Sequence, residues 1–332
     1  MENLLEVKNL TTRFHTFDGI VHALNGVTFH VGKGEILAVV GESGSGKSVA
    51  MMSILGLLPS PPATIDAGSA KLFTKDTAVD LLTLSKAEMN RVRGRQIGFI
   101  FQDALSALNP VMTVGSQISE TLVRHLDFSW GRARTRTIEL MNQVGIPGAA
   151  QRLNQYPHQF SGGMRQRVMI ALAAACRPRL LIADEPTTAL DVTVQAQILE
   201  LVLRLQREMD LSLIWITHDL GVVAGLADRV LVMYAGRPVE TAPVDTLYDH
   251  PLHPYTRGLL RAVPSLDRDT KAPLESIEGL PPDLLSPPCH CQFAWRCPCV
   301  FDRCWQDNPP YLEVAPGHIV TCFYDLDNGR PH

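Results

Sequence analysis

Residues 41–48 read GESGSGKS and lie between a strand-like run, EILAVV (35–40), and a helix-like run, KSVAMMSILGL (47–57). The eight residues fit the phosphate-loop pattern, with a glycine at each end of the loop followed by Lys and Ser. Glycines let such a loop curl so that its backbone N–H groups point inward at an anion, and the N-terminus of the next helix adds positive charge. Because the flanking strand and helix also fit, we interpret the loop as a nucleotide-phosphate site rather than a chance glycine-rich turn.

Within this loop, Lys47 is expected to reach the β- and γ-phosphates of a nucleotide, and the Ser48 hydroxyl to bind Mg²⁺. The other loop residues expected to contact the nucleotide are Gly41, Ser43, Gly44, Ser45 and Gly46.

Four more apolar runs of strand length follow along the chain: IGFIF (97–101), RLLIAD (179–184), LSLIWIT (211–217) and RVLVMY (229–234). Such runs suit strands buried on both faces of a mostly parallel sheet, and helix-like stretches lie between them. This alternation predicts an α/β domain over residues 1–250. Residues 105–160 contain no good strand, so we expect them to form a helical subdomain inserted between two halves of the sheet domain.

The run RLLIADEP brings two carboxylates, Asp184 and Glu185, to the carboxyl end of a predicted strand, where open α/β sheets bind ligands. Asp184 could hold Mg²⁺ through water, and Glu185 could orient or deprotonate the attacking water. Alone, the pair could equally cap the next helix. Paired with the phosphate loop, it favours a hydrolytic site.

The composition narrows the class of protein. The chain has 332 residues, of which 45% are hydrophobic and 19% charged, so it can bury a sizeable core and wholesale disorder is excluded. A net charge of −4 argues against a generic nucleic-acid coat. No segment approaches the ~20 apolar residues of a membrane span, and the start, MENLLEVKNL, lacks a signal-peptide apolar region. We expect a soluble, cytosolic chain that can still dock on a membrane protein.

The sequence FSGGM at 160–164 resembles the signature motif of ATP-binding cassette (ABC) ATPases, which usually reads LSGGQ. Further motifs occur in the order typical of that family. GFIFQD supplies a Q-loop glutamine, Gln102; TALD supplies a D-loop that ends in Asp191; and LIWITHD supplies a switch histidine, His218. Five ordered motifs spread over much of the chain are far more specific than a phosphate loop alone.

The resemblance implies an ABC-type nucleotide-binding domain, with a phosphate-loop sheet core plus a helical subdomain, that binds ATP and Mg²⁺. Gln102 would contact Mg²⁺ and the attacking water, His218 would touch the γ-phosphate, and Phe14 would stack on adenine. Without the family resemblance, Phe14 would also suit a core position, and a lone histidine such as His218 is more often structural. The signature residues, which the family turns toward the nucleotide of the other subunit, are Ser161, Gly162 and Gly163. A complete site then needs two cassettes, head to tail.

Longer segments resemble the ATP-binding subunits of bacterial dipeptide and oligopeptide importers, over essentially the whole chain. The segments are FQDALSALNPVMTVG (101–115), ACRPRLLIADEPTTALDVTVQAQI (175–198) and HPLHPYTRGLLRAVP (250–264). The resemblance implies a peripheral ATPase at the cytoplasmic face of the cell membrane that drives uptake of di- and oligopeptides. Its expected partners are a second ABC ATPase subunit (a paralogue), two membrane permease subunits and an extracellular or periplasmic peptide-binding protein, with no nucleic acid.

Other functions fit the sequence less well. Importers of nickel, sugars or other solutes are the nearest alternatives within the same fold. An ABC ATPase acting on nucleic acid is disfavoured by the single cassette and the lack of basic excess. A regulatory ATPase that never hydrolyses ATP is disfavoured by Glu185.

Six of the seven cysteines lie in the last part of the chain: Cys289, Cys291, Cys297, Cys299, Cys304 and Cys322. In a reducing compartment such a group indicates a metal or iron–sulfur site more than a disulfide scaffold. Four thiolates suit a [4Fe–4S] cluster and tetrahedral Zn²⁺ equally. Buried cysteines without a ligand are the remaining interpretation.

The family resemblance implies a [4Fe–4S] cluster, with Zn²⁺ as the alternative, held by Cys291, Cys297, Cys304 and Cys322. Cys289 and Cys299 are extra, and His290 or His318 could substitute as a ligand. We expect residues 251–332 to form a small Cys-rich extension that begins with one short helix and continues through a Pro-rich linker. A bound metal would stabilise so short a module.

Overall fold

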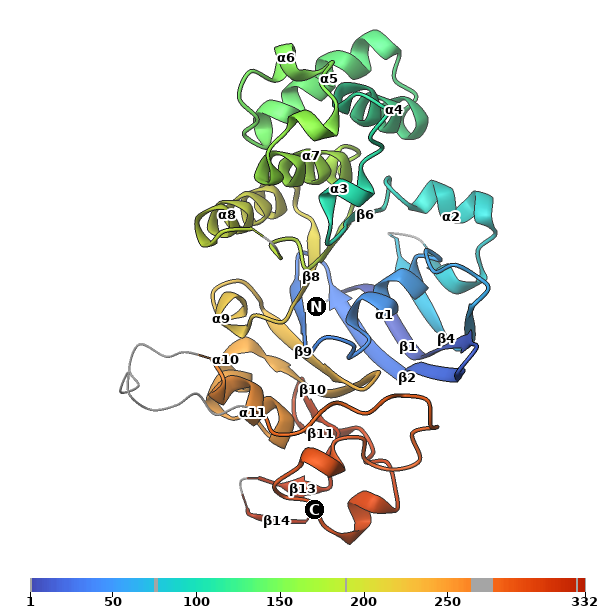
Figure 1. Ribbon diagram of the computed structural model, residues 1–332, viewed down its shortest axis with the longest axis vertical. Helices are drawn as coiled ribbons and strands as arrows, with labels where there is room; N and C mark the ends of the chain where they lie inside the picture. The colour runs from blue at the N-terminus through green and yellow to red at the C-terminus, as the bar shows by residue number, and fades with distance from the viewer. Residues whose placement is uncertain (1, 75–76, 189, 264–276, 327, 332) are drawn as a thin grey trace. The chain divides into compact units, whose positions relative to one another are not determined.

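The computed structural model describes residues 2–74, 77–188, 190–263, 277–326 and 328–331 (Figure 1). The chain divides into two compact units. The first contains Glu2, Gly32–Glu35 and Thr83–Ile216, and the second contains Asn3–Val31, Ile36–Leu82 and the chain from Thr217 onward.

The first unit is built on three parallel strands in the order β6-β7-β8, with bounds Ile97–Ile100, Leu180–Asp184 and Ser212–Thr217. Ile97 lies opposite Leu180, and Asp184 lies opposite Ile216. Every residue of β7 and β8 is buried. Burial on both faces explains why these strands appear in the sequence as continuous apolar runs.

Helices make up most of the rest of the first unit. They are α2 (Lys86–Val92), α3 (Ala104–Ala107), α4 (Val114–Leu126), α5 (Trp130–Gln143), α6 (Ala149–Arg152), α7 (Gly162–Ala174) and α8 (Val192–Met209), with a 3-10 turn, η2, at Pro157–Gln159. Figure 1 shows α4, α5 and α6 gathered with α7. The Thr113 and Ser129 hydroxyls cap α4 and α5 by accepting N–H groups of their first turns, which fixes where both helices begin.

The second unit contains an antiparallel sheet in the order β2-β1-β4-β5, which the apolar runs did not indicate. Its strands are β1 (Asn3–Thr16), β2 (Gly19–Gly32), β4 (Ala63–Phe73) and β5 (Ala78–Asp80), and β5 leads into a 3-10 turn, η1 (Leu81–Thr83). β1 alternates buried and half-exposed residues over much of its length, as expected for a strand with one face on the core.

The same unit contains a second run of strands in the order β11-β12-β10-β9-β3. The bounds are β3 (Ile36–Val40), β9 (Arg229–Tyr234), β10 (Arg237–Pro243), β11 (Leu312–Ala315) and β12 (His318–Val320). β3 and β9 are parallel, and the other pairs are antiparallel. Two strands from the end of the chain therefore belong to the same sheet as β3, the strand that leads into the phosphate loop.

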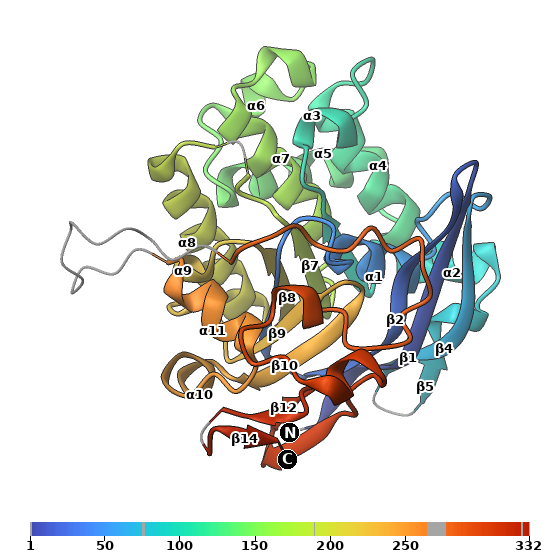
Figure 2. The same ribbon diagram turned by 60° about the horizontal axis from the view of Figure 1, so that its bottom comes forward.

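Short helices complete the second unit: α1 (Lys47–Ile54), α9 (Leu220–Val223), α10 (Val244–Asp249) and α11 (Pro254–Arg261), with 3-10 turns η3 (Ala294–Arg296) and η4 (Asp302–Trp305) and a small hairpin, β13 (Tyr324–Asp325) with β14 (Arg330–Pro331). Figure 2 shows α10 and α11 beside β9 and β10, with β12 next to β10.

The five strands expected from the apolar runs are present as β3, β6, β7, β8 and β9. The short helix expected within HPLHPYTRGLLRAVPSL (250–266) is present as α11, and residues 264–266 of that segment lie outside the described residues. Within the described ranges, no helix is both long enough and apolar enough to span a membrane.

Candidate nucleotide-binding site

The phosphate loop requires glycine at its first position. Gly41 has φ +149°, and a Cβ placed there would lie 2.2 Å from the carbonyl oxygen of Met233 on β9. Gly46, just before α1, has φ +96°, and a Cβ there would lie 2.9 Å from Leu24 Cδ2. The loop thus runs against β9 and β2 at distances that exclude any side chain at either position.

Lys47 is buried, and its ammonium lies within the loop. Lys47 Nζ donates hydrogen bonds to the carbonyl oxygens of Gly41 at 2.8 Å and Glu42 at 2.9 Å. The hydroxyl of Ser45 is also buried and has no hydrogen-bond partner in the part of the chain that the structure describes. A buried hydroxyl is unfavourable without a partner, so Ser45 and Lys47 together fit a loop that takes an anionic ligand.

Two further predicted residues of the second unit occupy different environments. Phe14 is half-buried near the end of β1, opposite Ala63, so it is not a fully enclosed core aromatic. His218 is exposed and follows the last residue of β8. Motif reasoning did not single out Phe17, whose ring is wholly exposed between β1 and β2. Apolar side chains are uncommon in two-residue turns, so the position of Phe17 in such a turn could have marked it from the sequence as an exposed aromatic.

The first unit brings Gln102 and Glu185 into contact. Gln102 Nε2 donates to Glu185 Oε2 at 3.1 Å, and Thr188 Oγ1 donates to the same oxygen at 3.0 Å. The backbone of Glu185 adopts φ +42°, and its N–H donates to Ile216 O at 3.0 Å, on β8. Asp184, directly before it, is buried at the end of β7. The carboxylate of Glu185 is therefore oriented by two side-chain donors as well as by its backbone.

The signature segment forms the start of α7. Ser161 is the N-cap, and its Oγ accepts the N–H of Met164 at 3.3 Å. A Cβ on Gly163 would lie 2.9 Å from Val194 Cγ1, so α7 and α8 approach closely there. Asp191 caps α8 by accepting the N–H of Val194 at 2.9 Å. Ala189, in the predicted D-loop, lies outside the described residues.

The predicted nucleotide-site residues are divided between the two units. The first unit contains Gln102, Ser161, Gly162, Gly163, Asp184, Glu185 and Asp191, and the second contains Phe14, Gly41, Ser43, Gly44, Ser45, Gly46, Lys47, Ser48 and His218.

The cysteines of the C-terminal segment pack into a small apolar core. Cys304 is buried with Ala294 and Phe323, and Cys291 lies against this group. Burial raises the pKa of the Cys297 and Cys322 thiols to about 12, so both stay protonated at neutral pH.

The prediction of a metal site at these cysteines is not supported. Within the described ranges no group of three or more His, Cys, Asp or Glu side chains is placed to hold a metal ion. His318, expected as a substitute ligand, instead contacts Glu240 Oε1 through Nε2 at 2.8 Å, and both side chains are buried. The other candidate, His290, has its ring centroid 6.1 Å from that of Trp305.

Comparison with known proteins identifies the class. Residues 24–188 match the ABC transporter family, and residues 239–304 match the oligopeptide/dipeptide transporter C-terminal region. Among solved structures, a dimeric ATP-binding cassette in a post-hydrolysis state with ADP and Pi superposes with a TM-score of 0.63. The two sequences are 27% identical, and the match covers 72% of this chain and 98% of that one. The protein is an ABC-type ATPase.

The relatives narrow this class further. The oligopeptide transport ATP-binding protein OppD of Bacillus subtilis is 53% identical over 96% of this chain and 87% of its own length. The dipeptide transport ATP-binding protein DppD of the same organism is 51% identical over 97% of this chain and 95% of its own length. OppD of Escherichia coli is 48% identical over 98% and 94%. The chain belongs to the ATP-binding proteins of oligopeptide and dipeptide ABC transporters, which confirms the resemblance seen in the sequence.

Proposed function

We propose that this chain is the ATP-hydrolysing subunit of an ABC importer that takes up di- or oligopeptides across the cell membrane. The observation that carries the proposal is the match of residues 239–304 to the C-terminal region of peptide transporters. The ABC match alone would suit an importer of nickel, a sugar or another solute. Identities near 50% that extend over nearly the whole chain add to this support.

The proposed hydrolytic residues act by positioning and by proton transfer. The loop around Lys47 holds the phosphates, and Glu185 accepts a proton from the attacking water. Gln102 keeps the Glu185 carboxylate in one orientation through the 3.1 Å contact, and His218 contacts the γ-phosphate. Ser48, Gln102 and Asp184 would hold Mg²⁺, which when bound neutralises charge on the β- and γ-phosphates.

A second cassette completes the proposed site. Ser161 caps α7 and Gly162 and Gly163 open it, so their N–H groups lie at the N-terminus of a 13-residue helix, where an anion would be stabilised. These residues would bind the nucleotide held by a partner subunit, and Asp191 would lie at the same junction. The pair would sit at the cytoplasmic face of the membrane on two permease subunits, which are supplied by a peptide-binding protein.

A [4Fe–4S] cluster, or Zn²⁺, on Cys291, Cys297, Cys304 and Cys322 is a separate proposal. It is supported by their spacing and by the N–H that Tyr324 donates to Cys322 Sγ at 3.4 Å, a contact that cluster thiolates commonly accept. Measurement of iron, zinc and acid-labile sulfide in anaerobically purified protein tests it. Protein free of all three would refute it.

Transport by the purified complex tests the peptide proposal. The ATPase pair, with the permease and binding protein that co-purify with it, is reconstituted into vesicles, and uptake of labelled di- and tetrapeptides is compared with uptake of nickel and maltose. We expect ATP-dependent uptake of peptide only. The same vesicles carrying Glu185→Gln provide the inactive control. Uptake of nickel or maltose in place of peptide would refute the assignment.

A further inference from the structure

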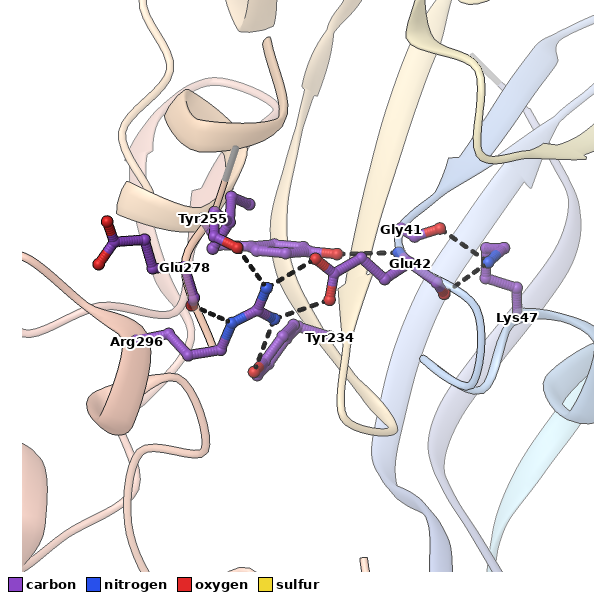
Figure 3. Close-up of polar contacts among 8 residues, drawn as sticks. Gly41, Glu42, Lys47, Tyr234, Tyr255, Glu278 and Arg296 are labelled. Atoms are coloured by element: carbon purple, nitrogen blue, oxygen red, sulfur yellow. Dashed lines mark hydrogen bonds and ion pairs between the residues drawn. The ribbon is translucent and has the colours of Figure 1, made fainter. Parts of the chain in front are cut away.

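Glu42 is the one residue of the phosphate loop to which the sequence motif gives no role. In the structure its carboxylate, its N–H and its carbonyl oxygen each have a partner (Figure 3). Two of these partners, Arg296 and Tyr255, come from the segment that follows the α/β domain. The third is Lys47.

Arg296 binds the Glu42 carboxylate with both of its terminal nitrogens. Nη1 lies 2.7 Å from Oε2 and Nη2 lies 2.9 Å from Oε1. This is the bidentate geometry in which arginine binds a carboxylate most strongly. The Arg296 side chain is only 5% exposed and that of Glu42 is 27% exposed, so water screens the pair weakly.

All five N–H donors of Arg296 have an acceptor. Besides Glu42, they bind the carbonyl oxygens of Glu278 at 3.0 Å and Ile277 at 3.3 Å, and the hydroxyl of Tyr234 at 3.3 Å. A guanidinium has five donors in a fixed plane, so this set of acceptors allows the group a single orientation. The hydrogen bond to Glu42, above all, raises the pKa of Arg296.

Tyr255 fixes the backbone at the same residue. Its hydroxyl accepts the N–H of Glu42 at 2.9 Å, and its side chain is fully buried. The Tyr255 ring packs against Tyr234, with centroids 4.6 Å apart, and against Phe293 at 5.4 Å. Two aromatic rings, Tyr234 from β9 and Phe293 from the cysteine-containing segment, thus hold the Tyr255 ring and its hydroxyl in place.

The contacts form a continuous path from the extension to the phosphate-binding lysine. Arg296 ends η3, which begins three residues after Cys291 and is followed directly by Cys297. Glu42 links this turn to Lys47, whose Nζ donates to the Glu42 carbonyl oxygen. If Arg296 were absent, a half-buried carboxylate without a counter-charge would lie in the loop, where it would repel phosphate and attract the Lys47 ammonium.

We propose that Arg296 and Tyr255 are positioning residues that hold Glu42, and with it the phosphate loop, in the form that binds ATP. The C-terminal extension then sets the affinity of the chain for nucleotide. This inference rests on the proposed nucleotide site and is independent of the transported solute.

The test is ATP binding to the purified full-length chain, measured by isothermal titration with Mg-ATP. Binding by the wild type tests the nucleotide site itself, and the ratio of variant to wild type tests this inference. We expect Arg296→Ala to raise the Kd at least ~10-fold, since the variant leaves the Glu42 charge unpaired. The matched control is Arg303→Ala, which removes an arginine of the same extension whose guanidinium lies 4.3 Å from the Phe323 ring centroid. The control should bind ATP as the wild type does.

A double-variant cycle separates positioning from general loss of structure. Glu42→Ala removes the charge that Arg296 neutralises, so Arg296→Ala should cost much less affinity in that background. Equal losses in both backgrounds, or a loss in Arg303→Ala as large as in Arg296→Ala, would overturn the proposal.

Tyr255→Phe covers the case in which Arg296→Ala does not fold. It removes only the hydroxyl that accepts the Glu42 N–H, and we expect a ~3-fold or greater rise in Kd. An unchanged Kd in a folded Tyr255→Phe protein would likewise overturn the proposal.

Discussion

Gln102 donates its side-chain N–H to Glu185 at 3.1 Å, although the two residues are 83 positions apart. Gln102 lies two residues after the end of β6, and Glu185 directly follows β7, which is parallel to β6. Parallel neighbours end at the same edge of the sheet, so the topology itself brings the amide to the carboxylate. Glu185 is thereby oriented while its carboxylate stays partly accessible.

Glu185→Gln should abolish turnover and keep ATP binding. The amide cannot accept the proton of the attacking water, so we expect the ATPase kcat of the assembled pair to fall ~100-fold or more. Binding of Mg-ATP should change little, because the phosphate loop is intact. Glu208→Gln, which alters a carboxylate near the exposed end of α8, is the control and should hydrolyse ATP normally. Full turnover in Glu185→Gln would show that the proposed base is wrong.

Two glycines of the phosphate loop should respond differently to alanine. At Gly41, a Cβ would meet the Met233 carbonyl at 2.2 Å, so Gly41→Ala must displace the loop and should weaken ATP binding ~10-fold or more. At Gly44, φ is +78° but no atom of the described chain lies within 4 Å of the new Cβ. Gly44→Ala should therefore leave the loop in place, with only backbone strain inside the chain, and lose less affinity than Gly41→Ala. Titration of both variants with Mg-ATP gives the comparison, and equal losses would contradict it.

A second glycine pair tests the packing of the signature helix. A Cβ on Gly163 would lie 2.9 Å from the β-branched side chain of Val194, so Gly163→Ala should destabilise the chain by about 1–2 kcal/mol. Gly131 in α5 has open space around the same position, and Gly131→Ala should stabilise by about 0.5 kcal/mol. Urea unfolding of the two variants checks both signs. A stable Gly163→Ala protein would mean that α7 and α8 separate at little cost.

Alkaline pH should destabilise the cysteine-containing segment. The pKa of Cys297 and Cys322 rises from the ordinary value of 9.0 to about 12 in the folded chain because the thiols are buried. The unfolded chain therefore loses these protons first, and stability that is present below pH 9 falls as the pH rises toward 12. We expect a loss of about 1 kcal/mol per thiol at pH 10.

The check is urea unfolding at pH 8 and pH 10 with a chelator present, in wild type and in a Cys297→Ala, Cys322→Ala double variant. The double variant shares every other titrating group, so its stability should fall less. An identical fall in both proteins would mean that these thiols ionise as readily in the folded chain as in the unfolded one.

Runs of apolar residues predicted the strands that are buried on both faces, and they did not predict the strands that have one exposed face. β7 and β8 were evident because strands buried on both faces leave an unbroken apolar run. The antiparallel sheet of β1, β2 and β4 was missed, because β1 mixes buried residues with polar ones such as Lys8 and Thr11. Motif order likewise indicated Gln102 and Glu185 as partners in one site before any geometry was known.

The pairing of Glu42 with Arg296 could not be predicted in this way. The two residues are 254 positions apart, and neither belongs to a periodic pattern or to a motif position with an assigned role. The same holds for His318 and Glu240, which are 78 positions apart, since the sequence offered His318 only as a possible substitute metal ligand. Contacts at such separations depend on the path of the whole chain, which residue spacing does not encode.

The pairing of β12 with β10 bears on how this protein can be trimmed. Glu240 faces Val320 and Thr241 faces Ile319 across that ladder, and β10 pairs on its other side with β9. A shortened chain that stops at residue 250 would leave the backbone N–H and C=O groups along this edge of β10 unpaired, and such an exposed edge promotes pairing with other copies and aggregation. It would also leave the buried Glu240 carboxylate without its contact to His318. Strands β11 and β12 are thus part of the nucleotide-binding sheet itself, and a shortened version of this protein that resists aggregation should keep both of them.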